Sequence, residues 1–483
     1  MHNDTSLGTG ILRKKDIEKA LAERLVEEAQ IAGASKSSIS ISKQKTWMLV
    51  ALIGASLVNT FVLGIVDVIA VSGFIGDTGI YNLPWLWVAE LLLSLIISGT
   101  IIQLIDKLPR MKMLRSLILI LFLTYTLLAV LFFFNLPTKF LYPLMYLIYA
   151  QQGILFPMAL WNLAGQVYSP SEAKKYFPVL SSGDLLGRLV GYSLFTLTGL
   201  LGHAELSQNL IHNPSMLMGI SGLLFAIGVF AFTRLPKFQT AFPAQEDSPW
   251  LENIKDCFET INEVPFFRNV SAIVAVTWIA LTLLLYNFYF TLDTASQQGF
   301  QFQTIYSIYN ITVLLIPLLF QWTIGDELLE RISPKNGYFF LPFTLLIGVG
   351  LAFFIPGLWG GVGALFISIV VYRGWYMPLY QSLYILVPAK KRGRIRGLLG
   401  SYSYIVGSLI AALFIGGMRL LLPLLDVDLA NAHNINLLAA LVAVFAAIYV
   451  AFRIRATYED SLLSWRVARR KRTSSELDKL ESI

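Results

Sequence analysis

Residues 117–134 read LILILFLTYTLLAVLFFF, eighteen consecutive positions without a charged side chain. An α-helix of that length rises about 27 Å, close to the thickness of the hydrocarbon core of a bilayer. Similar blocks recur along the 483-residue chain, which is 56% hydrophobic and only 14% charged. Because soluble domains carry charge on about a quarter of their residues, the sequence predicts an all-α, polytopic membrane protein.

The apolar blocks form two groups of six, which predicts about twelve transmembrane helices in two six-helix bundles. The predicted spans are 46–72, 84–105, 115–135, 141–167, 177–200 and 215–234, followed by 268–291, 303–324, 338–356, 360–387, 397–422 and 434–454. The predicted domains are a cytoplasmic tail with an amphipathic helix near Lys14–Ala29 (1–45), a first bundle (46–235), a central cytoplasmic loop (236–267), a second bundle (268–454) and a basic cytoplasmic tail (455–483). Pro243 and Pro249 in the polar central loop are typical of a hinge.

The basic residues predict the orientation. Of the 37 Lys and Arg residues, we place only Lys139 and Arg419 on the outer side and only Arg188 and Arg373 inside spans. Because short loops rich in Lys and Arg stay on the cytoplasmic side, both termini are expected in the cytoplasm. The dense basic clusters are also expected to contact anionic membrane lipids.

The composition argues against other classes of protein. A single cysteine, Cys257, and four scattered histidines predict no disulfide framework, no metal site and no cofactor. The Lys and Arg residues behind the net charge of +7 lie in loops on one side of the membrane. They do not form a basic face interleaved with aromatic residues, so no nucleic-acid binding is expected. No phosphate-binding glycine-rich loop, catalytic constellation or signal peptide is visible. We expect a monomer that is not an enzyme.

Five ionisable residues fall inside predicted spans away from the span ends: Asp67, Glu90, Asp184, Arg188 and Arg373. An ionised side chain at mid-bilayer costs ~2.5 to 3.5 kcal/mol on insertion scales, so such residues usually face a cavity or a partner. Asp184 and Arg188 are four positions apart and can pair on one helix face. The pair is either structural or functional, with Arg188 as a candidate substrate-binding residue and Asp184 as a candidate coupling or gate residue. Asp67 and Glu90 are candidate coupling residues, with a bound proton as one option.

Gly183, Gly187 and Gly191 recur every four residues beside that charged pair. Small residues at this spacing let another helix approach closely. We therefore expect the stripe to pack against a neighbouring helix rather than to bind substrate.

Arg373 has no acidic residue within one helical turn in sequence. Its partner must be another helix, a cluster of carbonyl groups or the substrate. The guanidinium fork matches phosphate or carboxylate oxygens in two parallel bonds. Arg373 is therefore a candidate anion-binding residue, with an interhelical salt bridge to Asp67, Glu90 or another acid as the alternative.

Three short stretches carry a resemblance to a known group of proteins. They are Leu83-Pro84-Trp85-Leu86; Trp161-Asn162-Leu163-Ala164 with Glu172-Ala173-Lys174-Lys175-Tyr176-Phe177-Pro178; and Pro378-Leu379-Tyr380-Gln381-Ser382-Leu383-Tyr384. These stretches, within a six-plus-six array, resemble the nucleotide (ATP/ADP) translocase group of the major facilitator superfamily. Bacterial members of that group often carry HEAT-repeat or cyclic-nucleotide-binding extensions, and no such extension is seen in this sequence.

The resemblance implies a facilitator-like fold, a nucleotide anion as substrate, and a multi-pass protein of the bacterial inner membrane, with the plastid envelope as the alternative. Facilitator cavities are lined largely by spans one, four, seven and ten. The resemblance therefore makes Asn59, Asn162 and Gln381 candidate substrate-binding residues beside Arg188 and Arg373. Interhelical hydrogen bonds are the alternative for each of these polar residues.

Glu172, Lys174 and Lys175 stand where the fourth and fifth spans meet the cytoplasm. They are either ordinary loop charges or members of a gate salt bridge that breaks as the two halves rock.

The leading hypothesis is a secondary active transporter of an organic anion, with a nucleotide exchanged in the manner of ATP for ADP, or another phosphorylated metabolite, as cargo. Two alternatives remain open: a lipid or lysolipid flippase, and a membrane sensor or scaffold that keeps the fold without transporting anything.

Overall fold

The computed structural model describes the backbone of residues 44–107, 109–201, 213–234, 265–299, 301–321, 323, 332, 334–382, 402–425 and 430–481. The amphipathic helix predicted near Lys14–Ala29, most of the central loop 236–267 and the basic loop 390–396 lie outside these residues. Within them the chain is almost entirely helical.

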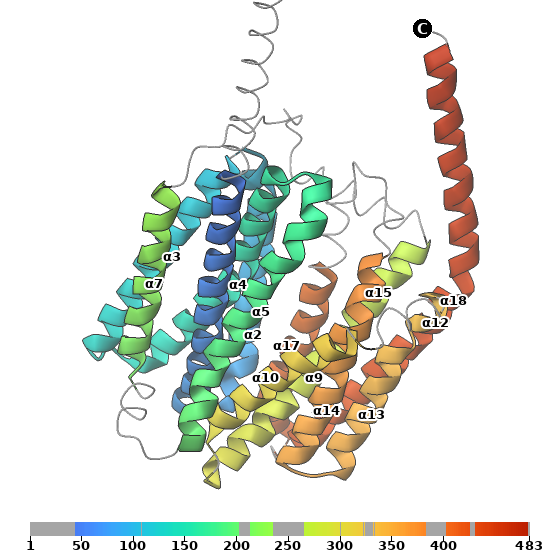
Figure 1. The fold of residues 1–483 in the computed structure, drawn as a ribbon. Helices are drawn as coiled ribbons and strands as arrows, with labels where there is room; N and C mark the ends of the chain where they lie inside the picture. Colours follow the sequence, from blue (N-terminus) through green and yellow to red (C-terminus); the bar gives the residue numbers. More distant parts are fainter. Residues whose placement is uncertain are drawn as a thin grey trace, which may run out of the picture.

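Six long helices build the N-terminal half, at the left of Figure 1. They are Gln44–Thr78, α2 (Leu83–Lys107), α3 (Arg110–Phe133), α4 (Thr138–Val167), α5 (Pro170–Leu201) and α7 (Pro214–Arg234). The short 3-10 helix η1 (Ile80–Asn82) leads into α2. Gly79, just before η1, has a φ of 86°, a conformation that glycine adopts without steric cost, so the chain can reverse in a few residues.

Six further spans build the C-terminal half, at the right of Figure 1. They are α9 (Pro265–Gln297); α10 (Phe302–Phe320); α12 (Pro334–Gly337) with α13 (Phe340–Phe354); α14 (Leu358–Val371) with the π-helical η3 (Tyr372–Tyr376) and α15 (Met377–Ser382); α17 (Ser403–Leu421) with η6 (Leu422–Leu425); and α18 (Ala430–Glu481).

Eleven helices of the described chain are long and apolar enough to cross a membrane. The twelfth long helix, α5, has 32 residues and is therefore long enough to span a membrane. It differs from the other eleven in carrying Asp184 and Arg188 in its interior. The prediction of about twelve spans in an all-α protein is thus confirmed. The predicted basic tail is also helical, because α18 continues to Glu481 as one helix of 52 residues.

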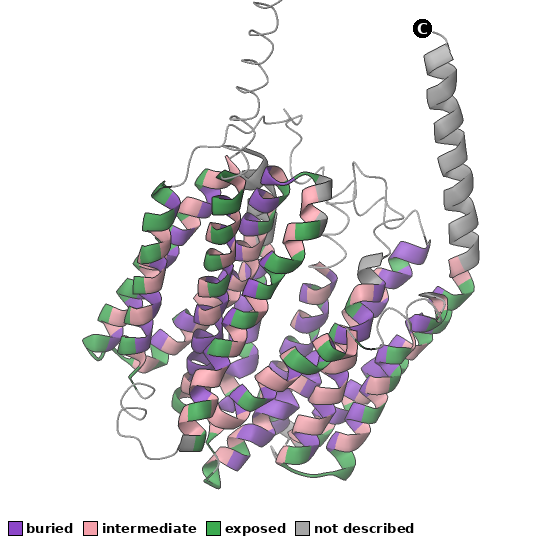
Figure 2. Ribbon diagram, viewed as in Figure 1, coloured by how far each residue is buried: buried purple, intermediate pink, exposed green. Residues whose placement is uncertain are grey.

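The surface of the bundles matches a lipid environment. Figure 2 shows buried residues where helices face each other and exposed residues on the outward faces. On α3, which contains the block quoted above, the exposed side chains include Leu119, Ile120, Leu123 and Leu127. Contiguous apolar surface of this extent is unusual on a soluble monomer, whereas hydrocarbon accepts it.

The glycine stripe packs as predicted. A Cβ atom built on Gly183 or Gly187 would lie within 3.0 Å of backbone atoms of the first helix, and Gly191 lies against Gly64. The first helix and α5 therefore run side by side with their backbones nearly touching. This close packing sets the positions of Asp67 and Arg188, which these two helices carry.

The two halves meet through two helix pairs, α5 with α10 and α2 with α17. The first helix also reaches the C-terminal half near its Thr78 end, where Gln303 donates to the Ser72 hydroxyl at 3.1 Å. The candidate site lies where the first helix, α5 and α10 converge.

Candidate functional site

Asp67 is the buried carboxylate at the contact between the halves. Asp67 is only 4% exposed. The Tyr192 hydroxyl from α5 donates to Oδ2 at 2.7 Å, and the Tyr306 hydroxyl from α10 lies 3.1 Å from Oδ1 and 3.2 Å from Oδ2. One tyrosine belongs to each half, so this carboxylate joins elements 239 residues apart in the chain.

Tyr306 is itself held in place by a second tyrosine. The hydroxyls of Tyr306 and Tyr289 are 3.0 Å apart, and their rings lie 5.7 Å apart with Phe288 beside them. The ring packing fixes where the Tyr306 hydroxyl points. It therefore approaches Asp67 from a rigid aromatic cluster in the C-terminal half.

Arg188 extends from α5 beside this carboxylate. Its Nε lies 3.9 Å from Oδ1 of Asp184, one turn earlier, and 27% of its side chain is exposed. It is also within electrostatic range of Asp67, Tyr149 and Tyr192. The local pairing of Asp184 and Arg188 predicted from their spacing is present. Because that pair is long and partly exposed, the guanidinium keeps donors for a further acceptor.

Arg373 enters the same region from the C-terminal half. It sits in the π-helical segment η3, a helix defect of a kind frequent at functional sites. Its side chain is exposed, its Nη1 donates to the Val313 carbonyl on α10 at 3.3 Å, and no acidic residue of the described chain pairs with it. Arg373 also interacts electrostatically with Tyr192 and Tyr309. The carbonyl contact was one of the three options predicted for this arginine.

Tyr309 adds an unsatisfied donor next to Arg373. Its hydroxyl is buried and finds no hydrogen-bond partner among the described residues. A buried polar group left unpaired costs roughly 1–3 kcal/mol, so such groups often mark a place where a ligand or water binds.

Tyr372, the residue before Arg373, belongs to an aromatic cluster with residues of α9 and α17. Trp278 packs edge-on against Tyr372 with centroids 5.2 Å apart and against Tyr404 at 4.4 Å. All three side chains are only partly buried. They offer ring surface next to the charged groups.

Asn59 has an interhelical role in this structure. Its Oδ1 accepts a hydrogen bond from Gln152 Nε2 at 2.9 Å, and Gln152 Oε1 in turn accepts the Tyr125 hydroxyl. All three side chains are buried. This chain of hydrogen bonds ties the first helix to α4 and α3. Interhelical hydrogen bonding, the alternative considered for Asn59, is a common role of polar residues in spans.

Glu90 belongs to a second buried polar chain in the same half. Ser94 donates to its Oε1 at 3.0 Å, and Gln151 donates to the Ser94 hydroxyl at 2.9 Å. Glu90 also interacts electrostatically with Tyr146 and with Tyr404 of the C-terminal half. It therefore lies near the contact between the halves but apart from Asp67.

The two amide candidates lie on spans four and ten, and only Asn162 has a contact among the described residues. The backbone carbonyl of Asn162 accepts Arg110 Nη1 at 3.2 Å. Gln381 lies in α15, and its side chain is outside the described residues.

Glu172 makes an ion pair at the predicted cytoplasmic end. Lys45 Nζ lies 2.7 Å from Glu172 Oε1, and the backbone and side chain of Ser169 both donate to Glu172 Oε2 at 2.9 Å. The hydrogen bond from Lys45 holds the pKa of the Glu172 carboxyl at about 2, well below its usual range. Both partners belong to the N-terminal half, so this pair does not bridge the halves in this conformation.

Of the two neighbouring lysines in that prediction, only Lys175 has a described side chain. Lys175 is exposed and lies 5.6 Å from the Tyr176 ring centroid. The side chain of Lys174 is outside the described residues. The gate role of these residues stays a prediction.

At the end predicted to face outward, the halves are in contact. Arg419 of α17 donates to Asn82 Oδ1 at 3.0 Å and stacks over the Tyr81 ring at 4.9 Å, both across the interface. Gly199 lies so close to Thr304 that a Cβ atom would come within 1.9 Å of the threonine hydroxyl. These contacts hold the two halves together at this end.

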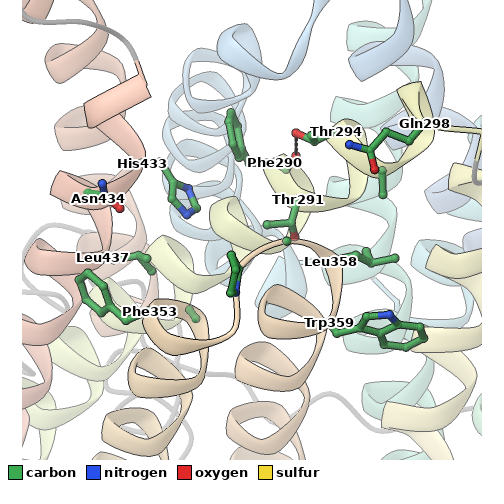
Figure 3. A pocket seen from close by; sticks show the side chains of 14 residues that line it. Phe290, Thr291, Thr294, Gln298, Phe353, Leu358, Trp359, His433, Asn434 and Leu437 are labelled. Carbon is green, nitrogen blue, oxygen red and sulfur yellow. Dashed lines mark hydrogen bonds between the residues drawn. The ribbon is translucent and has the colours of Figure 1, made fainter.

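A pocket of about 490 Å³ lies within the C-terminal half at this same end. Figure 3 shows Phe290 and Thr291 of α9 facing it, with Trp359 and His433 from α14 and α18. His433 also stacks on the Phe290 ring at 5.2 Å. No Lys or Arg belongs to the described lining, so this pocket is a poor site for an anion.

Three tyrosines of the central site were missed by reasoning from the sequence. Tyr149, Tyr192 and Tyr306 sit in apolar helices where aromatic residues are usually packing groups. Nothing in the sequence around them distinguishes these three tyrosines from packing groups. Among the described residues no group of three His, Cys, Asp or Glu side chains could hold a metal ion.

No protein-family model matches this sequence, and no curated protein matches it. Solved structures do match. A bacterial homolog of the human lysosomal transporter Spinster, in an inward-facing and unoccupied conformation, is 15% identical, with a TM-score of 0.60 over 87% of this chain and 98% of that one. The nucleoside transporter NupG is 15% identical, with a TM-score of 0.61 over 85% and 99%.

A D-xylose-proton symporter is 13% identical, with a TM-score of 0.57 over 85% of this chain and 96% of that one. At these identities the likeness concerns the fold alone. The chain has the twelve-helix fold of major facilitator superfamily transporters.

Proposed function

We propose that this protein is a secondary active transporter of an organic anion that works by alternating access between its two halves. The observation that carries the proposal is the pair Arg188 and Arg373. They come from opposite halves, both interact with Tyr192, and Arg373 has no acidic partner in the described chain. Two guanidinium groups that act on the same tyrosine inside a membrane favour an anion as substrate, and the nearby carboxylates satisfy them only in part.

The cargo we favour is a nucleotide or another phosphorylated metabolite. Phosphate oxygens suit bidentate binding by arginine, and the partly buried rings of Trp278, Tyr372 and Tyr404 could stack on a base. The resemblance of the Glu172–Pro178 stretch to nucleotide translocases supports the same class. NupG, a structural neighbour, is a nucleoside transporter.

The contact at the outer end supports alternating access. Arg419, Tyr81 and Asn82 hold the halves together there, as expected of a carrier that opens toward the cytoplasm. We further propose a cell-membrane location with both termini cytoplasmic. Without a phosphate-binding loop in the sequence, we expect exchange or an ion gradient to drive transport.

The test is uptake of labelled ATP, ADP and inorganic phosphate into proteoliposomes preloaded with the unlabelled anion. An arginine–phosphate contact corresponds to about 1.5–3 kcal/mol, so Arg373→Ala and Arg188→Ala should each lower kcat/KM for uptake by roughly ten- to a hundredfold.

Arg453→Ala is the matched control, because Arg453 is exposed on α18 and, among the described residues, hydrogen-bonds the Tyr449 hydroxyl alone, at 3.4 Å. Its uptake should equal wild type. Normal uptake in both Arg188→Ala and Arg373→Ala would refute the arginine site. Folded wild-type protein that takes up no anion would favour the flippase or the non-transporting sensor.

A further inference from the structure

The pocket of about 490 Å³ is framed by helix ends of the C-terminal half. Its described lining comes from α9, α13, α14 and α18, with the turn from α13 into α14 at the rim (Figure 3). Gly361 lets α14 lie directly on α9 there, because a Cβ atom at this position would come within 2.3 Å of the Thr291 hydroxyl oxygen. These walls belong to one bundle, unlike the site around Asp67, which both halves build.

Four aromatic rings line the pocket. Phe290 and His433 stack on each other with centroids 5.2 Å apart, and both are only partly buried. Phe353 and Trp359 reach the pocket from α13 and α14, and they are 37% and 74% exposed. Rings of these residue types are the surfaces on which proteins stack nucleobases. The pocket therefore offers stacking surface from two pairs of helices.

Polar side chains stand at the mouth of the pocket. Gln298 follows the end of α9, Asn434 lies near the start of α18, and both are exposed. Each amide carries two donors and an acceptor, the combination with which Asn and Gln read the edge of a base. Thr294 adds a hydroxyl oxygen, which donates to the Phe290 carbonyl at 2.9 Å and keeps lone pairs for a donor on a ligand.

The described lining includes no Asp, Glu, Lys or Arg. A phosphate group buried here would lose its hydration without gaining a cation. The pocket therefore favours an uncharged compound, in contrast to the site that contains Arg188 and Arg373.

We propose that this pocket binds an uncharged nucleobase or nucleoside at the end of the protein predicted to face outward. Its volume lies within the range of small-ligand pockets, about 300–1,000 Å³. The base stacks among the four rings, and its polar edge and the ribose hydroxyls meet the two amides at the mouth. This site is separate from the proposed anion site and does not require that the protein transport an anion.

The experiment measures binding of labelled adenosine to the full-length protein in phosphatidylcholine nanodiscs. Wild type should bind adenosine saturably. Trp359→Ala should weaken binding by about five- to a hundredfold, the factor that corresponds to the loss of one stacked ring. Gln298→Ala should weaken it by about two- to tenfold through the loss of neutral hydrogen bonds. Both side chains are exposed, so both variants should fold.

Phe354→Ala is the matched control. Phe354 is 88% exposed at the end of α13, next to Phe353, but it is not part of the pocket lining. Its affinity for adenosine should equal that of wild type. A loss equal to that of Trp359→Ala would overturn the site, because exposed rings outside the pocket would then account for the binding. Wild type that binds no adenosine would overturn it as well.

Competition identifies the class of ligand. Unlabelled adenine should displace labelled adenosine, whereas ATP should compete no better than adenosine itself, because its phosphates find no cation in the described lining. Displacement by glucose as effective as that by adenosine would overturn the assignment in favour of a sugar. Binding of adenosine in detergent but not in nanodiscs would overturn it in favour of a membrane lipid.

Arginine variants separate this site from the proposed anion site. The double variant Arg188→Ala/Arg373→Ala should bind adenosine with wild-type affinity. Loss of binding in that variant, with normal binding in Trp359→Ala, would place adenosine between the halves and overturn the pocket. Wild type that binds adenosine through Trp359 but takes up no anion would reject only the proposed function.

Discussion

Gly187→Ala is expected to separate the first helix from α5 and to weaken both folding and transport. A Cβ atom at this position would lie 2.3 Å from the Leu57 carbonyl oxygen, 2.1 Å from the Thr60 hydroxyl and 2.9 Å from the Phe61 amide nitrogen. Thr60 can change rotamer, but the backbone atoms cannot move without the helix. The added methyl group must therefore push the two helices apart.

The magnitude follows from these distances. Unstrained carbon–oxygen contacts begin at about 3.4 Å, so the helices would have to move apart by roughly 1 Å. Overpacking of this kind typically costs about 1–3 kcal/mol, and the gain of up to about 1 kcal/mol from replacing a helical glycine offsets only part of it. Arg188, in the next position, would also shift relative to Asp67, so exchange activity should fall more than stability alone explains.

The assay is the thermal unfolding midpoint in detergent, with proteoliposome exchange as the second readout. Gly165→Ala, on α4, is the matched control, because a Cβ atom built on Gly165 would have no neighbouring atom within 4 Å. Gly187→Ala should melt several degrees lower, while Gly165→Ala should melt at or slightly above wild type. Equal melting temperatures for the two variants would refute the close packing of the first helix on α5.

Three further outcomes are expected. Gln152→Ala should lower the melting temperature through a loss of about 1–3 kcal/mol, because it leaves buried polar partners unsatisfied. The KM for the anion should stay unchanged. A raised KM with normal stability would instead favour a substrate role for the hydrogen-bonded chain of Asn59 and Gln152. Glu172→Gln should lower the melting temperature by a constant amount from pH 8 down to about pH 5. The folded pKa of Glu172 is depressed to about 2. Its contribution to stability is therefore present above the unfolded value near 4.5 and is lost as the pH falls from that value towards 2. A difference that persists unchanged at pH 3 contradicts the ion pair with Lys45. Arg419→Ala should make a cysteine placed at Ser72 react faster with an impermeant maleimide, since the arginine holds the outer end closed; an unchanged labelling rate would show that other contacts suffice.

Much of the architecture could be read directly from the order of residues. Hydrophobic blocks long enough to span a bilayer predict helices whatever surrounds them, because lipid leaves the backbone no other way to satisfy its hydrogen bonds. The packing of the glycine stripe on α5 could also be predicted, because residues spaced by four lie on one face of a helix. The local pair of Asp184 and Arg188 followed from the same geometry.

The partners of the isolated polar residues required the tertiary structure. Glu172 was expected near other loop charges, yet it binds Lys45, 127 residues earlier. For Arg373 the options were another helix, a carbonyl cluster or the substrate, and the structure shows it donating to the carbonyl of Val313. Helical periodicity states which residues share a face but not how far that helix rotates or slides against its neighbours.

The sequence by itself therefore determined that this chain crosses the membrane about twelve times, in two groups of six, with a few ionisable groups inside. Each of these properties depends on the residues of one segment and the solvent around it. Only the tertiary structure decided that Asp67 would meet Tyr192 and Tyr306, and that Arg188 and Arg373, from opposite halves, would both interact electrostatically with Tyr192. Those contacts depend on how two bundles dock, which is set by the packing of many side chains at once and by no single segment.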